Sequence, residues 1–249
     1  MNNHMKQKQG GQFLAKDKLG TPVVVQWTKT TIMSPDFANA MKEMWPLARG
    51  AYTPVEMDFL KAFPEVVGTE PYFKPFEPLF QNGVANVDWL AAQTAMESIL
   101  EGHFVFDPTQ LSEQVVAMFA NDSCFLVTVN DQETGTPLGF ITFLARANYT
   151  AGEVKVMSFA VQTTHQKRGL GKLLMSSIFK IAPKTKRIFL ATRVTNNVAL
   201  HAYSSWGFVT DKKPILDHAF NLKHWSFMDY KAEQCDVLQN IAQELYLVS

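Results

Sequence analysis

The chain has 249 residues, 47% of them hydrophobic and 18% charged, with 23 Lys plus Arg against 23 Asp plus Glu. This is the composition of an ordinary globular protein, long enough to bury a substantial core in one large domain or two small ones. A net charge of zero argues against a broad nucleic-acid-binding surface, which needs clustered positive charge.

Neither the cysteines nor the hydrophobic runs point to secretion or to a membrane. Cys124 and Cys235 lie far apart and in no CxxC spacing, so they predict neither a disulfide framework nor a zinc site. The polar start, MNNHMKQKQGGQ, lacks the apolar core of a signal peptide. No run approaches the ~18 apolar residues of a spanning helix. We therefore expect a cytoplasmic protein with no metal and with no membrane or nucleic-acid partner.

The chain begins with a polar stretch, followed by one strand and one helix. Residues 1–20 predict a flexible arm, and residues 21–249 a single domain. The valines within residues 22–30 favour a strand. Ser34 then offers a helix N-cap and Pro35 suits the first helical position, so a helix is expected to start there.

Residues 46–80 differ in composition from the rest of the chain. They hold six of the twelve prolines and, together with Trp45, eight aromatic side chains. Proline at this density excludes long helices and central strands. So many aromatic side chains would not be left in water, which argues against disorder. We expect an ordered, irregular excursion packed on the domain.

After this excursion the pattern alternates between helices and strands, as in a mixed α/β fold. In chain order we expect helices at 87–102 and 107–122 (a region of extra helices, 87–120), strands at 124–130, 138–146 and 152–162, a helix from about 169 to Pro183, a strand at 187–194, a short helix at 197–206, strands at 207–211 and 222–231, and a C-terminal helix over 232–247.

The stretch HQKRGLGKLL, residues 165–174, places two glycines and three cationic side chains directly before an apolar helix. A strand, a basic glycine turn and a helix in this order predict an anion site. Glycine allows close backbone approach, and the helix start offers free N–H groups and a positive dipole end. Gly169 and Gly171 are too close together for a Walker loop, and position 174 is Leu where a dinucleotide-binding GxGxxG needs glycine.

FAVQTTHQKRGLGKLL carries Gln166, Gly169 and Gly171 in the pattern Q/R-x-x-G-x-G/A. Further along, NNVALHAYSSWGF carries Asn196, Ala199, Tyr203, Gly207 and Phe208 in the pattern N-x-x-A-x-x-x-Y-x-x-x-G-F. Together these segments resemble the GNAT superfamily of N-acetyltransferases, in which the first pattern is the acetyl-CoA motif. The resemblance implies an α/β (mixed α+β) GNAT acyl-CoA N-acyltransferase fold, in which a mostly antiparallel sheet splays at its middle and is flanked by helices.

By that resemblance the chain would bind acetyl-CoA in the splay and acetylate an amine acceptor. The end of the central strand would pair with the pantetheine arm, the turn would hold the pyrophosphate, and the second segment would contact the cofactor near its sulfur. The implied cofactor-binding residues are Phe159, Ala160, Val161, Gln166, Lys167, Arg168, Gly169, Leu170, Gly171, Lys172, Asn196 and Tyr203.

The resemblance also implies how the catalytic roles are divided. The N–H of Val161 would stabilise the oxyanion. The phenol of Tyr203 would give a proton to the leaving thiolate, although without the motif Tyr203 reads as a core tyrosine. Lys155, a cation, stands where family members that acetylate proteins often carry a glutamate base. Glu153, on the same strand face, either acts as the general base in its place, through water, or is a solvated strand-end carboxylate.

His218 and His224 are further candidates for the general base.

Two functions remain open at this point. The first function is an N-acetyltransferase that moves an acetyl or short acyl group from acetyl-CoA to a primary amine, of a small molecule or of a protein, in a ternary complex. The alternative is a catalytically inactive acyl-CoA-binding domain that acts as a sensor or interaction module. The sequence does not identify the acceptor amine, and it does not distinguish a monomer from a homodimer.

Overall fold

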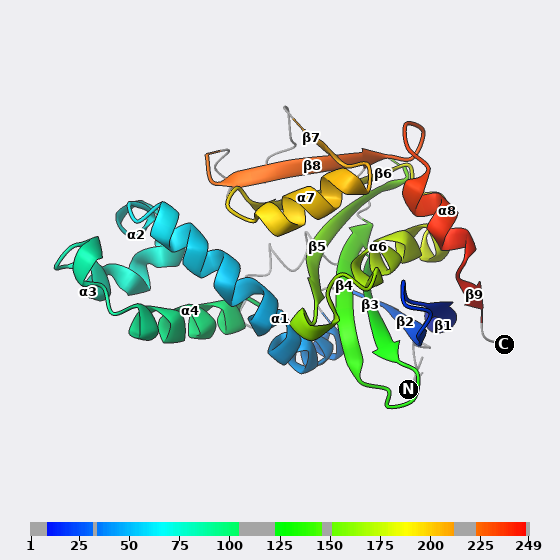
Figure 1. Ribbon diagram of the computed structural model, residues 1–249, viewed down its shortest axis with the longest axis horizontal. Helices are drawn as coiled ribbons and strands as arrows, with labels where there is room; N and C mark the ends of the chain where they lie inside the picture. The colour runs from blue at the N-terminus through cyan, green and yellow to red at the C-terminus, as the bar shows by residue number, and fades with distance from the viewer. Residues whose placement is uncertain (1–8, 32–33, 105–122, 146–150, 212–222, 248–249) are drawn as a thin grey trace, which may run out of the picture.

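The computed structural model describes residues 9–31, 34–104, 123–145, 151–211 and 223–247 of the chain. Nine strands of these residues form one sheet in the order β7-β8-β6-β5-β4-β3-β2-β1-β9 (Figure 1). The helix expected at 107–122 lies outside the described residues. The strands are β1 (Gln9–Lys16), β2 (Pro22–Thr30), β3 (Ser123–Asp131), β4 (Pro137–Ala145), β5 (Glu153–Val161), β6 (Arg187–Arg193), β7 (Val209–Thr210), β8 (Trp225–Lys231) and β9 (Tyr246–Leu247).

The sheet opens in its middle, between β5 and β6. Every strand pair within the described residues is antiparallel except this one, in which Glu153–Lys155 lie beside Arg187–Phe189. Beyond that short parallel contact, β5 continues to Val161 beside β4, and β6 continues to Arg193 beside β8. The expected mostly antiparallel sheet with a central splay is confirmed.

A β-bulge lies in β5 just before the part of the strand that faces this opening. The register against β4 skips Met157, which lies between the paired residues Val156 and Ser158. One extra residue moves all following side chains to the other face of the sheet. Val156 and Phe159 therefore contact the same core although one number is even and the other odd, whereas Ala160 is buried on the opposite face.

Helices cover both faces of the sheet (Figure 1). Leu174 and Leu238, from α6 and α8, join the hydrophobic core on one face, and Met41 of α1 packs against Phe140 on the other. None of the helices in the described part of the chain has the length and apolar character needed to cross a membrane. The helices are α1 (Pro35–Ala62), α2 (Val66–Thr69), α3 (Glu77–Phe80), α4 (Trp89–Phe104), α6 (Leu170–Ile181), α7 (Asn197–Ser205) and α8 (Val237–Gln243), with short 3-10 helices at η1 (Pro71–Phe76), η2 (Val84–Asn86) and η4 (Thr163–His165).

Helix α1 runs for 28 residues through Pro46 and Pro54, so the prediction that residues 46–80 hold no long helix was wrong. Both prolines lie on the exposed side of α1. There, the carbonyls that lose their N–H partner can bond to water, and the helix can bend around the core. The opposite side buries apolar residues such as Ala48 and Phe59 completely. This packing, more than the local helix propensity, stabilises the helix.

The second half of α1 leaves the sheet and forms a helical lobe, residues 54–104, with α2, η1, α3, η2 and α4 (Figure 1). The lobe has a hydrophobic core of its own, in which Phe59, Phe73 and Phe76 are fully buried. Their rings pack on one another, with Phe59 and Phe73 centroids 5.7 Å apart. The aromatic segment is therefore ordered, as expected, but these side chains build the lobe itself.

Both ends of the described chain join the sheet, which differs from the sequence prediction. Residues 9–16, expected in a flexible arm, form β1, which pairs with β2 along its whole length and buries Phe13. The helix expected over 232–247 is shorter, because α8 ends at Gln243 and β9 follows as a strand beside β1. This last pairing joins opposite ends of the chain, a contact that no local sequence pattern encodes.

Candidate active site at the splayed end of β5

The predicted anion turn connects β5 to α6 through η4. Gly169 is the N-cap of α6 and has a left-handed backbone with φ of 81°, and Lys167 is also left-handed with φ of 63°. A non-glycine residue in this region is uncommon. Left-handed residues in such turns direct successive N–H groups toward one point, the arrangement of an anion-binding nest. The free N–H groups at the start of α6 add to it.

The two glycines of the turn serve different purposes. Gly169 is required for its backbone conformation, since a side chain there would meet only ordinary contacts, 3.4 Å from Lys18 Cβ. Gly171 is required for packing, because a Cβ atom would lie 3.0 Å from the Phe159 ring and 3.2 Å from the Trp206 ring. The first turn of α6 thus lies directly against the end of β5 and the end of α7.

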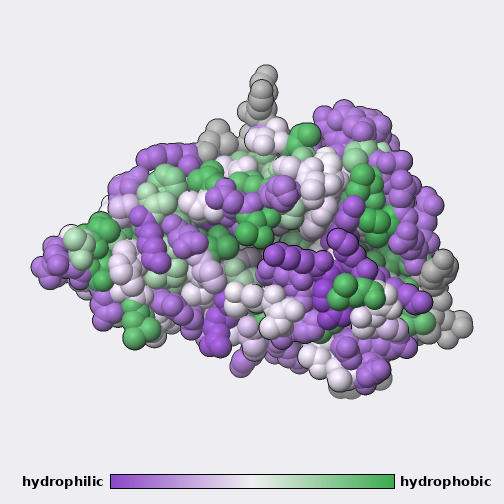
Figure 2. All heavy atoms as spheres, viewed as in Figure 1, coloured by the Kyte–Doolittle hydropathy of each residue, from purple (hydrophilic) through white to green (hydrophobic). Residues whose placement is uncertain are grey.

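Among the cationic side chains of the turn, Arg168 has a structural partner. Its Nε lies 2.6 Å from Asp17 Oδ2, and its backbone carbonyl accepts a hydrogen bond from the N–H of Lys18 at 2.8 Å. The Arg168 guanidinium is therefore engaged with the loop between β1 and β2. Lys167 is exposed and Lys172 is half-buried. Figure 2 shows hydrophilic residues gathered over the region where α6 begins.

Asn196, expected to contact the cofactor, caps the short helix α7. Its Oδ1 accepts the N–H of Ala199 at 3.2 Å, and its Nδ2 donates to the hydroxyl of Thr192 at 3.0 Å. An asparagine at an N-cap satisfies a helix N–H that would otherwise lack a partner. Both polar atoms of the side chain are thus used in positioning α7, which carries Tyr203.

Tyr203 lies at the splay, packed against the end of β5. Its ring centroid is 6.2 Å from that of Phe159 and 5.6 Å from those of Trp206 and Phe208. Burial raises the pKa of Tyr203 well above its usual value, and the nearby Tyr52 phenol raises it further. The Tyr203 phenol therefore stays protonated at neutral pH, so it can donate a proton but cannot act as a base.

Tyr52, which sequence reasoning missed, reaches the same strand end from α1. Its hydroxyl oxygen accepts the N–H of Phe159 at 2.8 Å and donates to the carbonyl of the same residue at 3.2 Å. Burial raises the pKa of Tyr52 to about 12, although hydrogen bonds with the Phe159 backbone and the Ser158 side chain act in the opposite direction. No sequence signal links residues 107 positions apart.

Glu153, expected as a possible general base, lies at the other end of β5. Eight residues of extended chain separate it from Val161, roughly 26 Å at about 3.3 Å per residue. Its Oε1 accepts a hydrogen bond from Nη1 of Arg187 at 3.0 Å, and Arg187 also binds Asp229 at 2.7 Å and Asp211 at 3.2 Å. This carboxylate helps hold the paired ends of the central strands and does not reach the splay.

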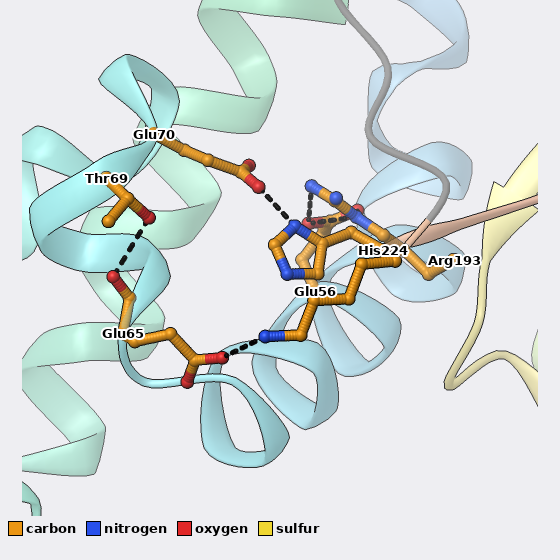
Figure 3. A network of polar contacts seen from close by, with 7 residues as sticks. Glu56, Glu65, Thr69, Glu70, Arg193 and His224 are labelled. Carbon is orange, nitrogen blue, oxygen red and sulfur yellow. Dashed lines mark hydrogen bonds and ion pairs between the residues drawn. The ribbon is translucent and has the colours of Figure 1, made fainter.

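A second polar cluster joins the helical lobe to the ends of β6 and β8 (Figure 3). Arg193 is bound by both carboxylate oxygens of Glu56, with Nη2 to Oε2 at 2.9 Å, and its guanidinium lies 4.0 Å from the Phe59 ring centroid. His224 contacts Glu70 through Nδ1. Nη1 of Arg193 and Nε2 of His224 are buried and have no hydrogen-bond partner among the residues that the structure describes. His218, the other histidine considered as a base, lies outside the described residues.

A groove runs beside the end of β5 on the α1 side of the sheet. Its volume is about 330 Å³. The helix α1 forms one wall, and the segment that leads from β5 into η4 forms the other. The groove is lined by Glu43, Met44, Pro46, Leu47, Gly50, Pro137, Gln162, Thr163 and Thr164.

The chain is similar to known acetyltransferases in sequence and in structure. The sequence model of the acetyltransferase (GNAT) family matches residues 91–208. No curated protein sequence matches the chain. PaiA N-acetyltransferase from Thermoplasma acidophilum, solved in complex with coenzyme A, is 14% identical over 83% of this chain and 98% of its own, with a TM-score of 0.42.

Two further solved structures are similar at comparable levels. A putative acyl-CoA N-acyltransferase from Klebsiella pneumoniae is 16% identical over 66% of this chain and 91% of its own, with a TM-score of 0.39. Nourseothricin acetyltransferase is 19% identical over 45% of this chain, with a TM-score of 0.35, and the chain covers 65% of its length, a little under two thirds. The family match over residues 91–208 includes both the splayed pair β5–β6 and the glycine turn before α6, so this part of the chain is similar to the GNAT acetyltransferase family.

Proposed function

We propose that the protein transfers an acetyl group from acetyl-CoA to a primary amine by direct attack in a ternary complex. The observation that carries this proposal is the position of the left-handed turn at Gly169, directly beside the splayed end of β5. In this proposal the turn from Gln166 to Lys172 holds the pyrophosphate on its N–H groups. The positive end of the α6 dipole favours the same charge.

The pantetheine arm is proposed to add to β5 along the edge that β6 leaves open. The N–H of Gln162 donates to Leu138 on the β4 side at 2.8 Å. Because alternate residues of a strand direct their backbone groups to the same edge, Ala160 also faces β4, whereas Phe159 and Val161 face the splay. The backbone of Val161 is thus directed toward the space where an extended arm would pair with it.

The proposed reaction needs few side chains. The neutral amine nitrogen attacks the thioester carbon, a C–N bond forms, the C–S bond breaks, and CoA leaves as a thiolate. Tyr203 gives its phenolic proton to that sulfur, and the phenolate recovers a proton, through water, from the nitrogen that has formed the amide. The products are the N-acetylated amine and CoA thiol, so no protein carboxylate is required in place of Glu153.

The acceptor is proposed to approach along the groove between α1 and the end of β5. The groove carries one carboxylate, Glu43, beside apolar residues such as Met44 and Leu47. That lining suits a cationic amine with an apolar body. The core of the opposite face is filled by side chains of α6 and α8, which supports entry from the α1 side.

The second candidate function is an acyl-CoA-binding domain without turnover. The observation in its favour is the Tyr52 hydroxyl, which engages both backbone groups of Phe159 at the strand edge where catalysis would occur. Both functions require CoA binding, so binding by itself does not separate them.

The test is amine-dependent release of CoA thiol. Acetyl-CoA is incubated with the protein and a panel of polyamines, amino acids and peptides with free N-termini, and the acylated products are identified by mass spectrometry. We expect thiol release that requires one class of amine and slows strongly in Tyr203→Phe. Tight binding of acetyl-CoA with no product from any amine would favour the binding domain.

A further inference from the structure

The Tyr52 hydroxyl is hydrogen-bonded to both backbone groups of Phe159 on the open edge of β5. It accepts the N–H of Phe159 at 2.8 Å and donates to the Phe159 carbonyl at 3.2 Å. The donated bond is the longer of the two, and its acceptor is a neutral carbonyl. The proton of the phenol is therefore the more easily redirected part of this arrangement, whereas the oxygen is held firmly by the backbone N–H.

The following inference rests on the proposed function, because it concerns the thioester of acetyl-CoA. An arm that pairs with Val161 along the open edge brings its next carbonyl to the level of Phe159, the next residue that faces this edge. At that level the carbonyl oxygen meets the Tyr52 hydroxyl before it can reach the N–H behind it. Tyr203 lies against the same residue from α7.

Displacing the Tyr52 ring would be the costly way to accommodate a thioester. The ring packs beside Phe104 with centroids 6.1 Å apart, and Tyr52 lies within α1, which is held on the sheet by its neighbours Trp45 and Ala48. Rotation of the O–H bond alone moves no heavy atom and keeps the bond from the Phe159 N–H. The rotated hydroxyl exchanges a bond to a neutral carbonyl for one to the thioester oxygen.

We propose that Tyr52 is a catalytic residue of the acetyl transfer, whose hydroxyl donates a hydrogen bond to the thioester oxygen. As the amine attacks, the carbonyl π electrons move onto that oxygen, and the bond from Tyr52 strengthens with the growing negative charge. The Phe159 N–H, donating to the phenol oxygen, polarises the O–H further. When the C–S bond breaks the carbonyl re-forms, so Tyr52 loses no proton in the cycle.

The protonation state of Tyr52 is compatible with this role. Burial raises the pKa of its phenol to about 12, so it remains a hydrogen-bond donor throughout the neutral range. The roles of the two tyrosines follow from their positions. Tyr52 contacts the backbone of Phe159 and would lie at the carbonyl oxygen of the thioester, whereas Tyr203 contacts the Phe159 ring and would lie at the sulfur. The role first assigned to the N–H of Val161 passes in this proposal to the hydroxyl of Tyr52.

The infrared stretching frequency of the thioester carbonyl tests the proposed hydrogen bond from Tyr52 directly and requires no amine acceptor. Acetyl-CoA labelled with ¹³C at the carbonyl is bound to wild type, Tyr52→Phe and Tyr203→Phe, and difference spectra are recorded. We expect a lowered carbonyl frequency in wild type, loss of that shift in Tyr52→Phe, and retention of it in Tyr203→Phe. Turnover of Tyr52→Phe should fall about 10²–10³-fold, as for other lost oxyanion donors, with the Kd for acetyl-CoA within about threefold of wild type.

A shift that persists in Tyr52→Phe, or its absence in wild type with acetyl-CoA bound, would overturn the assignment. A tighter Kd for acetyl-CoA in Tyr52→Phe, with no change for free CoA, would mean that the phenol competes with the carbonyl and would also overturn it. If Tyr52→Phe does not fold, 3,5-difluorotyrosine at position 52 replaces it, and its more acidic phenol should enlarge the shift. Failure of wild type to bind either CoA or acetyl-CoA would count against the proposed function itself.

Discussion

Nε of Arg168 lies 2.6 Å from Oδ2 of Asp17, and this contact ties the turn before α6 to the loop between β1 and β2. The Asp17 side chain is fully buried, and it also accepts the N–H groups of Leu19 and Thr21 at 2.9 and 2.8 Å. Arg168, which the motif resemblance implied as a cofactor-binding residue, thus helps to keep the turn in place. The β1–β2 hairpin, which the sequence predicted to be partly a flexible arm, supports the proposed cofactor site.

Replacing Asp17 by Asn should destabilise the protein in a pH-dependent way. Burial acts to raise the pKa of Asp17, but the hydrogen bonds from Thr21, Arg168 and Leu19 outweigh it and hold the pKa below its usual value. Because the pKa of Asp17 is lower in the folded state than in the unfolded state, its ionised form stabilises the fold at pH values above the unfolded-state pKa of about 3.9. This stabilisation is lost as the pH falls through the folded-state pKa. At neutral pH we expect a loss of about 2 kcal/mol in Asp17→Asn, measured by urea unfolding.

The difference between wild type and Asp17→Asn should shrink as the pH is lowered below about 4, because Asp17 takes up a proton first in the unfolded state and, at lower pH, in the folded state. A difference that stays constant down to the acid transition would mean that the charge of Asp17 does not contribute to stability.

Gly169→Glu should abolish binding of CoA and acetyl-CoA. The new carboxylate would stand at the N-terminus of α6, where the pyrophosphate is proposed to lie, and would repel it. Isothermal titration calorimetry measures the loss, and thermal unfolding monitors the fold. Gly83→Glu is the matched control, because Gly83 has the same φ of 81° and open space around it but lies in the helical lobe.

Gly83→Glu imposes a similar backbone strain and should bind CoA normally. Normal binding by Gly169→Glu would remove the pyrophosphate from this turn. Equal loss of binding in both glycine variants would indicate a general effect of strain on the fold.

Tyr203→Phe should reduce turnover by about 10²-fold, whereas Lys155→Ala should stay within about threefold of wild type. Tyr203 lies at the splay, but Lys155 lies in the short segment that still pairs with β6. Because burial raises the pKa of the Tyr203 phenol, the ratio should hold from about pH 6 to about pH 9. Steady-state kinetics over that range provides the measurement. A larger loss in Lys155→Ala would contradict the role given to the tyrosine.

Glu56→Gln should cost about 3–5 kcal/mol of stability, because it leaves the charge of Arg193 buried without its partner. The two side chains are only 10% and 5% exposed. Arg193→Met combined with Glu56→Leu should recover much of the loss, since no buried charge remains. Chemical denaturation of Glu56→Leu, Arg193→Met and the double variant completes the thermodynamic cycle.

The exposed ion pair between the same two parts of the molecule is the control for this cycle. Lys223 and Glu65 are 60% and 51% exposed, and Lys223→Met should change stability by less than about 1 kcal/mol. Similar costs for the two pairs would show that burial is not what makes the Glu56–Arg193 contact important.

The central part of the site could be predicted because it is encoded locally. The strand at 153–161, the turn at Gly169 and the helix that follows use neighbouring residues, so hydrophobic period and turn chemistry are enough to place them. The spacing to Asn196 and Tyr203 adds a second local signal. These elements agree with the prediction to within a residue or two at their ends.

The features that could not be predicted from the sequence depend on burial and on contacts between residues far apart in the chain. The prolines of α1 argued against a helix, but whether Pro46 and Pro54 face water or the core is decided by packing. Glu153 lies at the end of β5 that pairs with β6, away from the splay, and which end of β5 pairs is decided by a strand 34 residues further along. The contact of Tyr52 with Phe159 joins two segments that no periodicity or motif connects.

The structure of the wild-type protein with bound acetyl-CoA tests the central claim most directly. The account predicts the pyrophosphate on the N–H groups between Gln166 and Lys172, the pantetheine arm along β5 at Val161, and the thioester between the hydroxyls of Tyr52 and Tyr203. A cofactor bound elsewhere on the chain, or one whose thioester lies away from both tyrosines, would contradict it.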